Sequence, residues 1–210
     1  MNTPSREVPI DPAHAALLIV DVQNYCAHPD GIASRKLNPQ QRTYLFARLR
    51  ETVLPNLQRL QSACRRAHVE IVYAAVESLT RDGRDRSLDY KISGIDVPRG
   101  SWEAQVLEEI APAEDEIVFR KTSSSVFIST NIDYVLRNLE ARSLIVAGMM
   151  TDQCVESAVR DACDLGYLVT LVTDACLTDS AERHEQSLIG IRGYCRQRTT
   201  GELLAEIEHL

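Results

Sequence analysis

Residues 143–167, SLIVAGMMTDQCVESAVRDACDLGY, contain a predicted strand followed by a predicted helix, and the fold is predicted from this unit. The apolar run 143–148 has the length of a strand that is buried on both faces, as in a parallel sheet covered by helices. A helix is expected over 152–165, because apolar residues recur there at spacings of three and four, and Gly166 stands where a C-terminal cap is expected. The apolar residues of this helix are Val155, Ala158, Val159, Ala162 and Leu165.

The same alternation runs through the rest of the chain. Further apolar runs of strand length occupy 15–20, 69–76, 116–119 and 167–173. Helical patterns occupy 39–66, with Pro55 placed to break or kink the helix, and also 130–140 and 180–194. Strands that alternate with helices predict an α/β fold, a doubly wound parallel sheet of five or six strands with helices on both faces.

Length and charge limit the class of protein. A chain of 210 residues is predicted to form a single domain over 1–210. No apolar run approaches the roughly 20 residues of a membrane span, and the polar start lacks a secretory signal, so we expect a cytoplasmic protein. A net charge of −7 argues against nucleic acid or an anionic membrane as the main partner.

The cysteines and one long loop need separate interpretation. The cysteines are widely spaced and form no CxxC pair, which indicates reduced thiols and argues against a structural zinc site. The segment 78–101 is rich in turn-forming and charged residues without a clear period, and we interpret it as a lid. The cysteines are Cys26, Cys64, Cys154, Cys163, Cys176 and Cys195.

Three polar residues follow strands of the predicted sheet: Asp21, Lys121 and Cys154. In an open parallel sheet, ligands bind outside the carboxyl ends of the strands. Each residue alone has an ordinary explanation: a turn aspartate, a surface lysine, or a small cysteine that fills the core. Together, however, they supply an acid, a cation and a nucleophile for amide hydrolysis.

The position of Cys154 favours the role of nucleophile. It falls in the first turn of its helix, where Thr151 or Asp152 could cap and the positive end of the helix dipole would stabilise a thiolate. A nearby ammonium would lower the pKa of the thiol further. Backbone N–H groups at the start of the helix could hold the oxyanion of a tetrahedral intermediate.

Three segments resemble the signatures of the isochorismatase-like cysteine hydrolase superfamily, and the resemblance extends from about residue 15 to residue 200. The segments are LLIVDVQNYC (17–26), FRKTSSSVF (119–127) and VAGMMTDQCVESAVRDACDLGY (146–167).

This resemblance implies a three-layer sandwich around a six-stranded, mostly parallel sheet, and a catalytic triad of Asp21, Lys121 and Cys154. It also implies a cis peptide bond between Met149 and Met150. We assign the oxyanion hole to the backbone N–H groups of Met150 and Cys154. A homodimer or homotetramer is expected from the family.

The resemblance also indicates a branch of the superfamily. Members that hydrolyse isochorismate lack the cysteine, whereas this chain has Cys154. The nicotinamidase branch carries a metal-binding Asp-x-His motif after the second strand, but AAVESLTRDG (74–83) stands here and no histidine follows until His184. The chain therefore resembles the metal-free amidases of the ureidoacrylate, biuret and N-carbamoylsarcosine types. We expect neither a metal nor a cofactor, with nicotinamidase-like activity as an alternative.

Polar residues near the strand ends are candidates for substrate binding. Glu77 could accept hydrogen bonds from a ureide, or instead form a salt bridge with Arg81 or Arg84. Gln23 and Asn24 could orient Asp21 or the substrate, although asparagine at a strand end is commonly a turn former.

The aromatic candidates are Tyr25, Trp102 and Phe127, which could wall the pocket or belong to the core. His184 is expected to be a surface or helix-cap residue.

The predicted reaction is hydrolysis of a small amide, ureide or carbamoyl compound through a thioester on Cys154. A dinucleotide- or flavin-binding protein would need a glycine-rich turn after the first strand, and DVQNYC (21–26) contains no glycine. A non-catalytic binding protein on the same fold is the remaining alternative.

Overall fold

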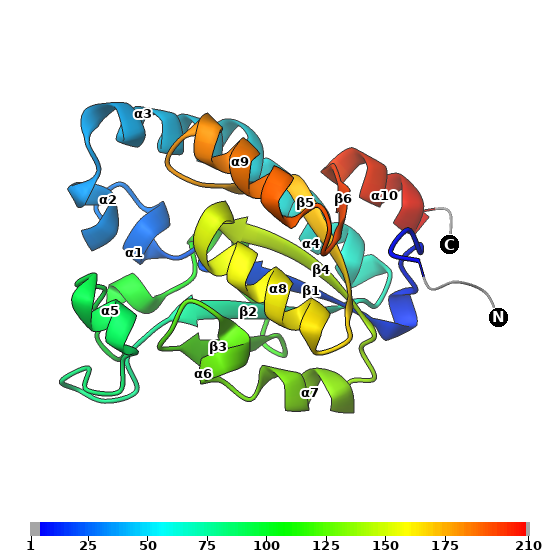
Figure 1. The fold of residues 1–210 in the computed structure, drawn as a ribbon, viewed down its shortest axis with the longest axis horizontal. Coiled ribbons are helices and arrows are strands. Elements are labelled where there is room, and N and C mark those ends of the chain that lie inside the picture. The colour runs from blue at the N-terminus through cyan, green and yellow to red at the C-terminus, as the bar shows by residue number, and fades with distance from the viewer. Residues whose placement is uncertain (1–4, 209–210) are drawn as a thin grey trace.

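A six-stranded sheet lies at the centre of the computed structural model, which describes residues 5–208 (Figure 1). Its strands are ordered β3-β2-β1-β4-β5-β6, and every pairing between neighbouring strands is parallel. The fold class predicted from the sequence is confirmed. The strands are β1 (Ala15–Val20), β2 (Glu70–Val76), β3 (Ile117–Lys121), β4 (Ser143–Met149), β5 (Leu168–Leu177) and β6 (Arg196–Arg198).

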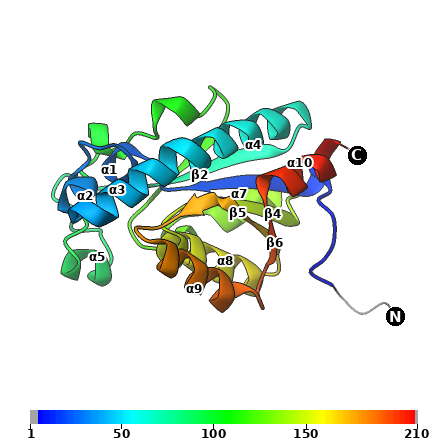
Figure 2. The same ribbon diagram turned by 90° about the horizontal axis from the view of Figure 1, so that it is seen from above.

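Helices cover both faces of the sheet, which gives three layers (Figure 2). α4 and α10 pack on each other and on β5 at one face, while α8, α9 and α6 lie together on the other. No helix within residues 5–208 has a length and hydrophobicity that would suit a membrane span. The helices are α1 (Asn24–Ala27), α2 (Ile32–Lys36), α3 (Pro39–Arg48), α4 (Leu54–Arg66), α5 (Leu88–Ile92), α6 (Val126–Ser129), α7 (Ile132–Asn138), α8 (Glu156–Asp164), α9 (Ala181–Ile191) and α10 (Thr200–Glu208).

The central strands are apolar because they are buried on both faces. All six residues of β1 and all seven of β4 are buried, as the continuous apolar runs predict. β1 lies between β2 and β4, so the order of the sheet reverses beside it. The carboxyl ends of β1 and β4 therefore meet where ligands bind in this class of sheet.

Two parts of the fold differ from the sequence prediction. The helical path over 39–66 does not break at Pro55, because a π-helical turn, Leu49–Val53, joins α3 to α4 just before it. Proline lacks an N–H to donate, and the wider turn accommodates this gap. β6 was not located because it has no apolar residue. Its Arg196 is nonetheless buried, since the guanidinium bonds to Glu206 and Thr170.

Gly148 permits the close approach of β1 and β4. Its φ is +124°, and it pairs with Val20 on β1. A Cβ atom at this position would overlap the carbonyl oxygen of Val20, which is backbone and cannot move aside. Glycine is therefore required where the two central strands end.

We predict that Gly148→Ala lowers the free energy of unfolding by about 3 kcal/mol, because it combines a steric overlap with an unfavourable φ. Urea denaturation measures this. The control is Gly190→Ala: Gly190 lies in α9 with open space around it, so alanine there should stabilise the protein by about 0.5–1 kcal/mol. Equal effects of the two substitutions would contradict the steric explanation.

Candidate active site

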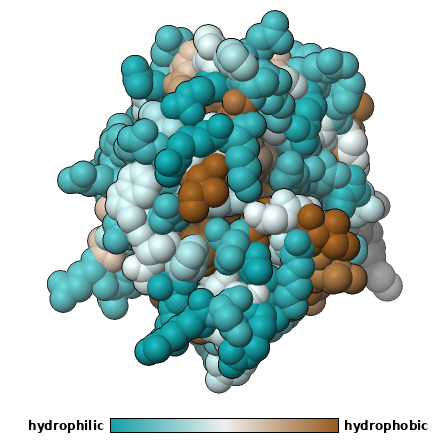
Figure 3. Space-filling model, turned by 90° about the vertical axis from the view of Figure 1, so that its left-hand side faces the viewer, coloured by the Kyte–Doolittle hydropathy of each residue, from teal (hydrophilic) through white to brown (hydrophobic). Residues whose placement is uncertain are grey.

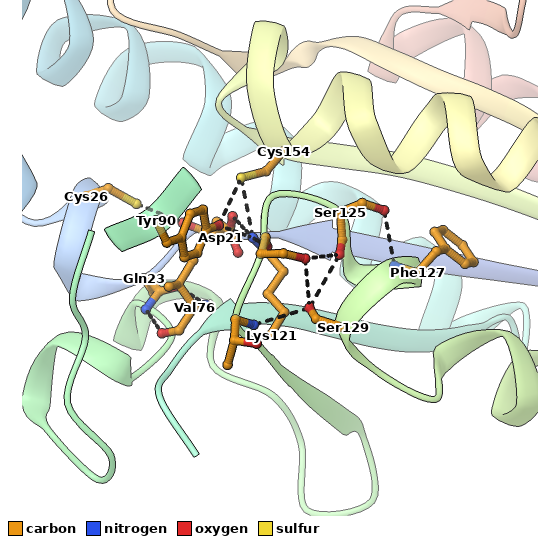
Figure 4. Close-up of polar contacts among 12 residues, drawn as sticks. Asp21, Gln23, Cys26, Val76, Tyr90, Lys121, Ser125, Phe127, Ser129 and Cys154 are labelled. Atoms are coloured by element: carbon orange, nitrogen blue, oxygen red, sulfur yellow. Dashed lines mark hydrogen bonds and ion pairs between the residues drawn. The ribbon is translucent and has the colours of Figure 1, made fainter. Parts of the chain in front are cut away.

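Asp21, Lys121 and Cys154 come together at the carboxyl edge of the sheet (Figure 4). Asp21 directly follows β1, Lys121 ends β3, and Cys154 lies in a π-helical turn, Thr151–Val155, after β4. The Lys121 Nζ atom is 2.9 Å from Asp21 Oδ2 and 3.3 Å from Cys154 Sγ. An acid, a cation and a thiol thus share one small site.

Lys121 is a buried ammonium surrounded by acceptors. Besides Asp21 and Cys154, its Nζ contacts the Tyr90 hydroxyl and the Ser123 carbonyl oxygen, both at 3.0 Å. Burial alone would lower the pKa of Lys121, but the Asp21 carboxylate, together with the hydrogen bond to Tyr90, raises that pKa well above its usual value. The side chain therefore stays protonated and acts as a fixed cation.

One carboxylate oxygen of Asp21 accepts no hydrogen bond from the described residues. Its φ of +52° is tolerated by aspartate, and its N–H donates to the carbonyl oxygen of Ala74. Burial raises the pKa of Asp21, although Lys121 opposes this. Within the described part of the chain, Oδ1 is buried without a hydrogen-bond partner. A buried acceptor without a donor is costly, so this oxygen is suited to receive a proton.

Cys154 is a thiol rather than a thiolate in this environment. Burial, reinforced by the negative charge of Asp21, raises the pKa of Cys154 to about 12, and the opposing effect of Lys121 is smaller. This differs from the sequence expectation of a thiolate stabilised by an ammonium and a helix end. The carboxylate that pairs with Lys121 offsets the ammonium, so the sulfur holds its proton at neutral pH.

The turn that contains Cys154 is stabilised by hydrogen bonds to other segments of the chain rather than by a helix cap of its own. The expectation that Thr151 or Asp152 caps the helix is wrong, because Met150 stands at the N-cap and makes no side-chain bond. The Thr151 hydroxyl instead bonds to His184 Nδ1 at 2.9 Å, and Asp152 accepts hydrogen bonds from Thr178 and Arg183.

His184 lies on α9 and is half-buried against this turn, whereas we expected a surface or helix-cap residue; the N-cap of α9 is Ser180. Burial lowers the pKa of His184, so the ring is neutral.

The turn also carries the backbone N–H groups that we predict to form an oxyanion hole. The peptide bond between Met149 and Met150 is cis. The N–H groups of Gln153 and Val155 donate to the Met150 carbonyl oxygen. The N–H groups of Met150 and Cys154, by contrast, reach no described acceptor outside the turn. These two groups are the ones for which we predict a role as oxyanion hole.

A cavity of about 150 Å³ adjoins the thiol. Since a water molecule occupies about 30 Å³ in the liquid, the space suits a small substrate or one end of a larger one. Residues of α1, α2 and α5 contribute to its lining. The side of the molecule that carries these helices shows apolar surface near the centre of a mostly polar face (Figure 3). The lining residues are Asp21, Tyr25, Cys26, Ala33, Val76, Tyr90, Ile95, Met149, Met150, Gln153 and Cys154.

Gln23 and Asn24 lie outside this lining and hold chain segments together. The Gln23 amide bonds to both the N–H and the carbonyl oxygen of Val76, at 2.7 and 3.0 Å, and donates to the Glu103 carbonyl oxygen. Asn24 donates to the Trp102 carbonyl oxygen. Their hydrogen bonds tie the end of β1 to β2 and to the following loop.

Glu77 forms a salt bridge, but with a partner that the sequence did not indicate. Its carboxylate is 2.9 Å from Arg120 on β3 and accepts the N–H of Gly100. The expected partners Arg81 and Arg84 are near Glu77 in the sequence, whereas Arg120 reaches Glu77 because β2 pairs with β3. The side chain does not line the cavity.

Of the aromatic candidates, Tyr25 lines the cavity and the other two do not. Trp102 is 42% exposed and its ring contacts that of His28. Phe127 packs against Tyr167.

Sequence reasoning missed two residues of the site. Tyr90 lies on α5, within the segment 78–101 for which we predict a lid, and is only 1% exposed. An aromatic residue inside a polar segment was the available signal. Cys26 donates its thiol to the Asp21 carbonyl oxygen at 3.1 Å, and burial raises the pKa of Cys26 strongly. All six cysteines are free thiols.

Histidine, cysteine and acidic side chains do not gather elsewhere in the described chain. Across residues 5–208, no three of them are placed to hold a metal ion together.

Comparison with known sequences places these observations in a family. The Isochorismatase domain family matches residues 15–202. Two relatives are ureidoacrylate amidohydrolases RutB. The protein from Rhizobium rhizogenes is 28% identical over 193 residues, covering 83% of this chain and 76% of the relative. That from Agrobacterium fabrum is 27% identical over 196 residues, covering 83% and 82%.

Solved structures share the fold. A cysteine hydrolase from Pseudomonas syringae pv. phaseolicola superposes with a TM-score of 0.84 at 25% identity, covering 100% of this chain and 99% of the other. N-carbamoylsarcosine amidase from Thermoplasma acidophilum gives a TM-score of 0.70 at 22% identity, covering 89% and 96%.

We predict that Asp21→Asn makes Cys154 at least about tenfold more reactive toward iodoacetamide at pH 7.5. The amide removes the negative charge that raises the pKa of the thiol and leaves Lys121 in place, and one unit of pKa corresponds to tenfold more thiolate. Alkylation of the Cys154 peptide is followed by mass spectrometry, with circular dichroism to verify folding. An unchanged or slower rate in folded protein would show that Asp21 does not control the thiol.

Proposed function

The chain belongs to the isochorismatase family of hydrolases, and we propose that it is a cysteine-dependent amidohydrolase. The proposed reaction cleaves the C–N bond of a small ureide, carbamoyl compound or primary amide and releases ammonia or an amine. The observation that carries the proposal is the placement of the Lys121 ammonium 2.9 Å from Asp21 and 3.3 Å from Cys154. The names of the ureidoacrylate amidohydrolase relatives support a ureide as the substrate class.

The first half of the proposed reaction forms a thioester. The Cys154 thiol gives its proton to Asp21 as the sulfur attacks the carbonyl carbon. The carbonyl oxygen becomes an oxyanion, which the N–H groups of Met150 and Cys154 would hold. When the intermediate collapses, the C–N bond breaks and the amine leaves with the proton from Asp21.

The second half releases the product. A water molecule gives a proton to Asp21 and attacks the thioester carbonyl carbon. The C–S bond then breaks, and the sulfur recovers the proton from Asp21. The acid leaves, and the thiol and the carboxylate are restored.

The protonation states favour Asp21 over Lys121 as the base. Lys121 has a pKa well above its usual value and is already bound to Asp21, Tyr90, Ser123 and Cys154. Asp21 has a buried oxygen without a donor. Because the pKa of Cys154 is about 12, a free thiolate is scarce, and proton transfer is expected to accompany the attack on the carbonyl.

We predict that Cys154→Ala and Cys154→Ser each lower ammonia release by at least about 10³-fold, since the nucleophile is lost or weakened. The assay compares urea derivatives and primary amides with and without a chelator, which we expect to have no effect. The matched control is Cys163→Ser, which changes a half-buried thiol on α8 whose Sγ donates to the Tyr194 carbonyl oxygen.

Two outcomes of this assay would refute the proposal. Turnover that survives in Cys154→Ala would exclude Cys154 as the nucleophile. Turnover that a chelator abolishes would point to a metalloenzyme.

A further inference from the structure

We propose that the substrate is uncharged and that its part next to the scissile carbonyl is apolar. This inference rests on the proposed function and concerns the wall of the same cavity. The apolar wall is built from several separate segments of the chain. Its residues are Ala33 on α2, Val76 at the end of β2, Ile95 in the segment 78–101, Met149 at the end of β4 and Met150 directly after it.

The charges around the cavity do not suit an anion. Asp21 is the one carboxylic acid among the described lining residues, and no lysine, arginine or histidine belongs to that lining. Lys121 stands behind Asp21, and its Nζ is already surrounded by four acceptors. A carboxylate bound here would lie near Asp21 without a cation of its own, and a buried unpaired charge is strongly unfavourable.

The polar groups of the wall suit a neutral amide. Tyr25 lines the cavity, and burial raises the pKa of Tyr25 to about 12, so its hydroxyl stays neutral. Gln153 is exposed at the rim and offers an amide that can both donate and accept. Neutral hydrogen-bonding groups of this kind match the N–H and C=O groups of an uncharged ureide or amide.

Matched pairs of substrates test this directly. We expect propylurea to exceed 3-ureidopropionate, and butyramide to exceed succinamate, by at least about 100-fold in kcat/KM. In each pair a carboxylate replaces one methyl group. If the anionic member is turned over as well as the neutral one, the inference is overturned while the proposed function stands. If neither member is turned over in a manner that depends on Cys154, the proposed function itself fails.

A cation added to the wall provides the converse test. Ala33→Arg should lower the ratio of kcat/KM for the neutral substrate to that for the anionic one at least about tenfold, because the guanidinium can pair with the carboxylate of the substrate. Ile95→Arg adds the same charge from another segment and guards against a folding defect in the first variant. The control is Ile92→Arg, since Ile92 is 77% exposed and lies outside the lining. An unchanged preference in both folded cavity variants would overturn the inference.

A separate observation concerns Tyr90, and we infer that it is a catalytic residue that donates a hydrogen bond to the Cys154 sulfur. Its hydroxyl oxygen lies 3.0 Å from Lys121 Nζ and 3.8 Å from Cys154 Sγ. An ammonium has only protons to give, so the phenol oxygen accepts from Lys121. The hydroxyl hydrogen is then free to point at the sulfur.

This donor matters when the thiol gives up its proton. Asp21 becomes neutral at that moment, and the sulfur carries negative charge as it attacks. A phenol O–H held on the sulfur stabilises this charge, and the contact with Lys121 polarises the O–H further. Because Tyr90 lies on α5, the segment 78–101 contributes directly to the reacting atoms.

Tyr90→Phe tests this role because it keeps the buried ring and removes only the hydroxyl. We expect iodoacetamide to alkylate Cys154 about three- to tenfold more slowly at pH 8, and kcat to fall about tenfold with KM changed less than twofold. The matched control is Tyr73→Phe: Tyr73 is also 1% exposed, but its hydroxyl bonds to Gln61 and Glu116 away from the site. Equal alkylation rates for Tyr90→Phe and Tyr73→Phe would refute the donor role.

Discussion

The buried ion pair between Lys121 and Asp21 is the constraint on which the site depends. Lys121 is fully buried and Asp21 almost so, which means that each charge must be matched inside the protein and that the desolvation of both is costly. Lys121 meets this requirement with a carboxylate, a hydroxyl, a carbonyl and a sulfur. These partners come from the end of β1, from α5, from the loop after β3 and from the turn after β4. Satisfying one ammonium therefore fixes four segments relative to one another.

The same pair sets the protonation of the thiol. An isolated lysine beside a cysteine would favour a thiolate, which reacts with many electrophiles and oxidants. Here the carboxylate of Asp21 offsets the ammonium, and burial raises the pKa of Cys154 to about 12. In the proposed reaction, the sulfur thus stays protonated until a substrate carbonyl is in place for it to attack. In the proposed mechanism, Asp21 Oδ1, which has no hydrogen-bond partner among residues 5–208, then accepts the proton.

Sequence patterns predicted the parts of the molecule that depend on local rules. Buried parallel strands require continuous apolar runs, so β1 and β4 could be predicted from the sequence. Residues that follow the strands of an open sheet converge at one edge, so Asp21 and Cys154 could be predicted to lie close together. Tyr90 could not be predicted as a residue of the site, because its position beside Lys121 depends on how α5 packs. The strand β6 could not be predicted either, because Arg196 is buried only through its bonds to distant residues.

The buried ion pair and the variable walls of the cavity also come from different parts of the fold. Lys121 ends β3 and Asp21 directly follows β1, so hydrogen bonds to neighbouring strands fix the backbone at both residues. Ala33 and Ile95, by contrast, belong to connections that leave the sheet and return to it. Connections tolerate changes in sequence and length better than central strands do. The walls of the cavity can therefore change while the buried ion pair stays, so we expect substitutions at Ala33 or Ile95 to change the charge of the substrate that the cavity accepts.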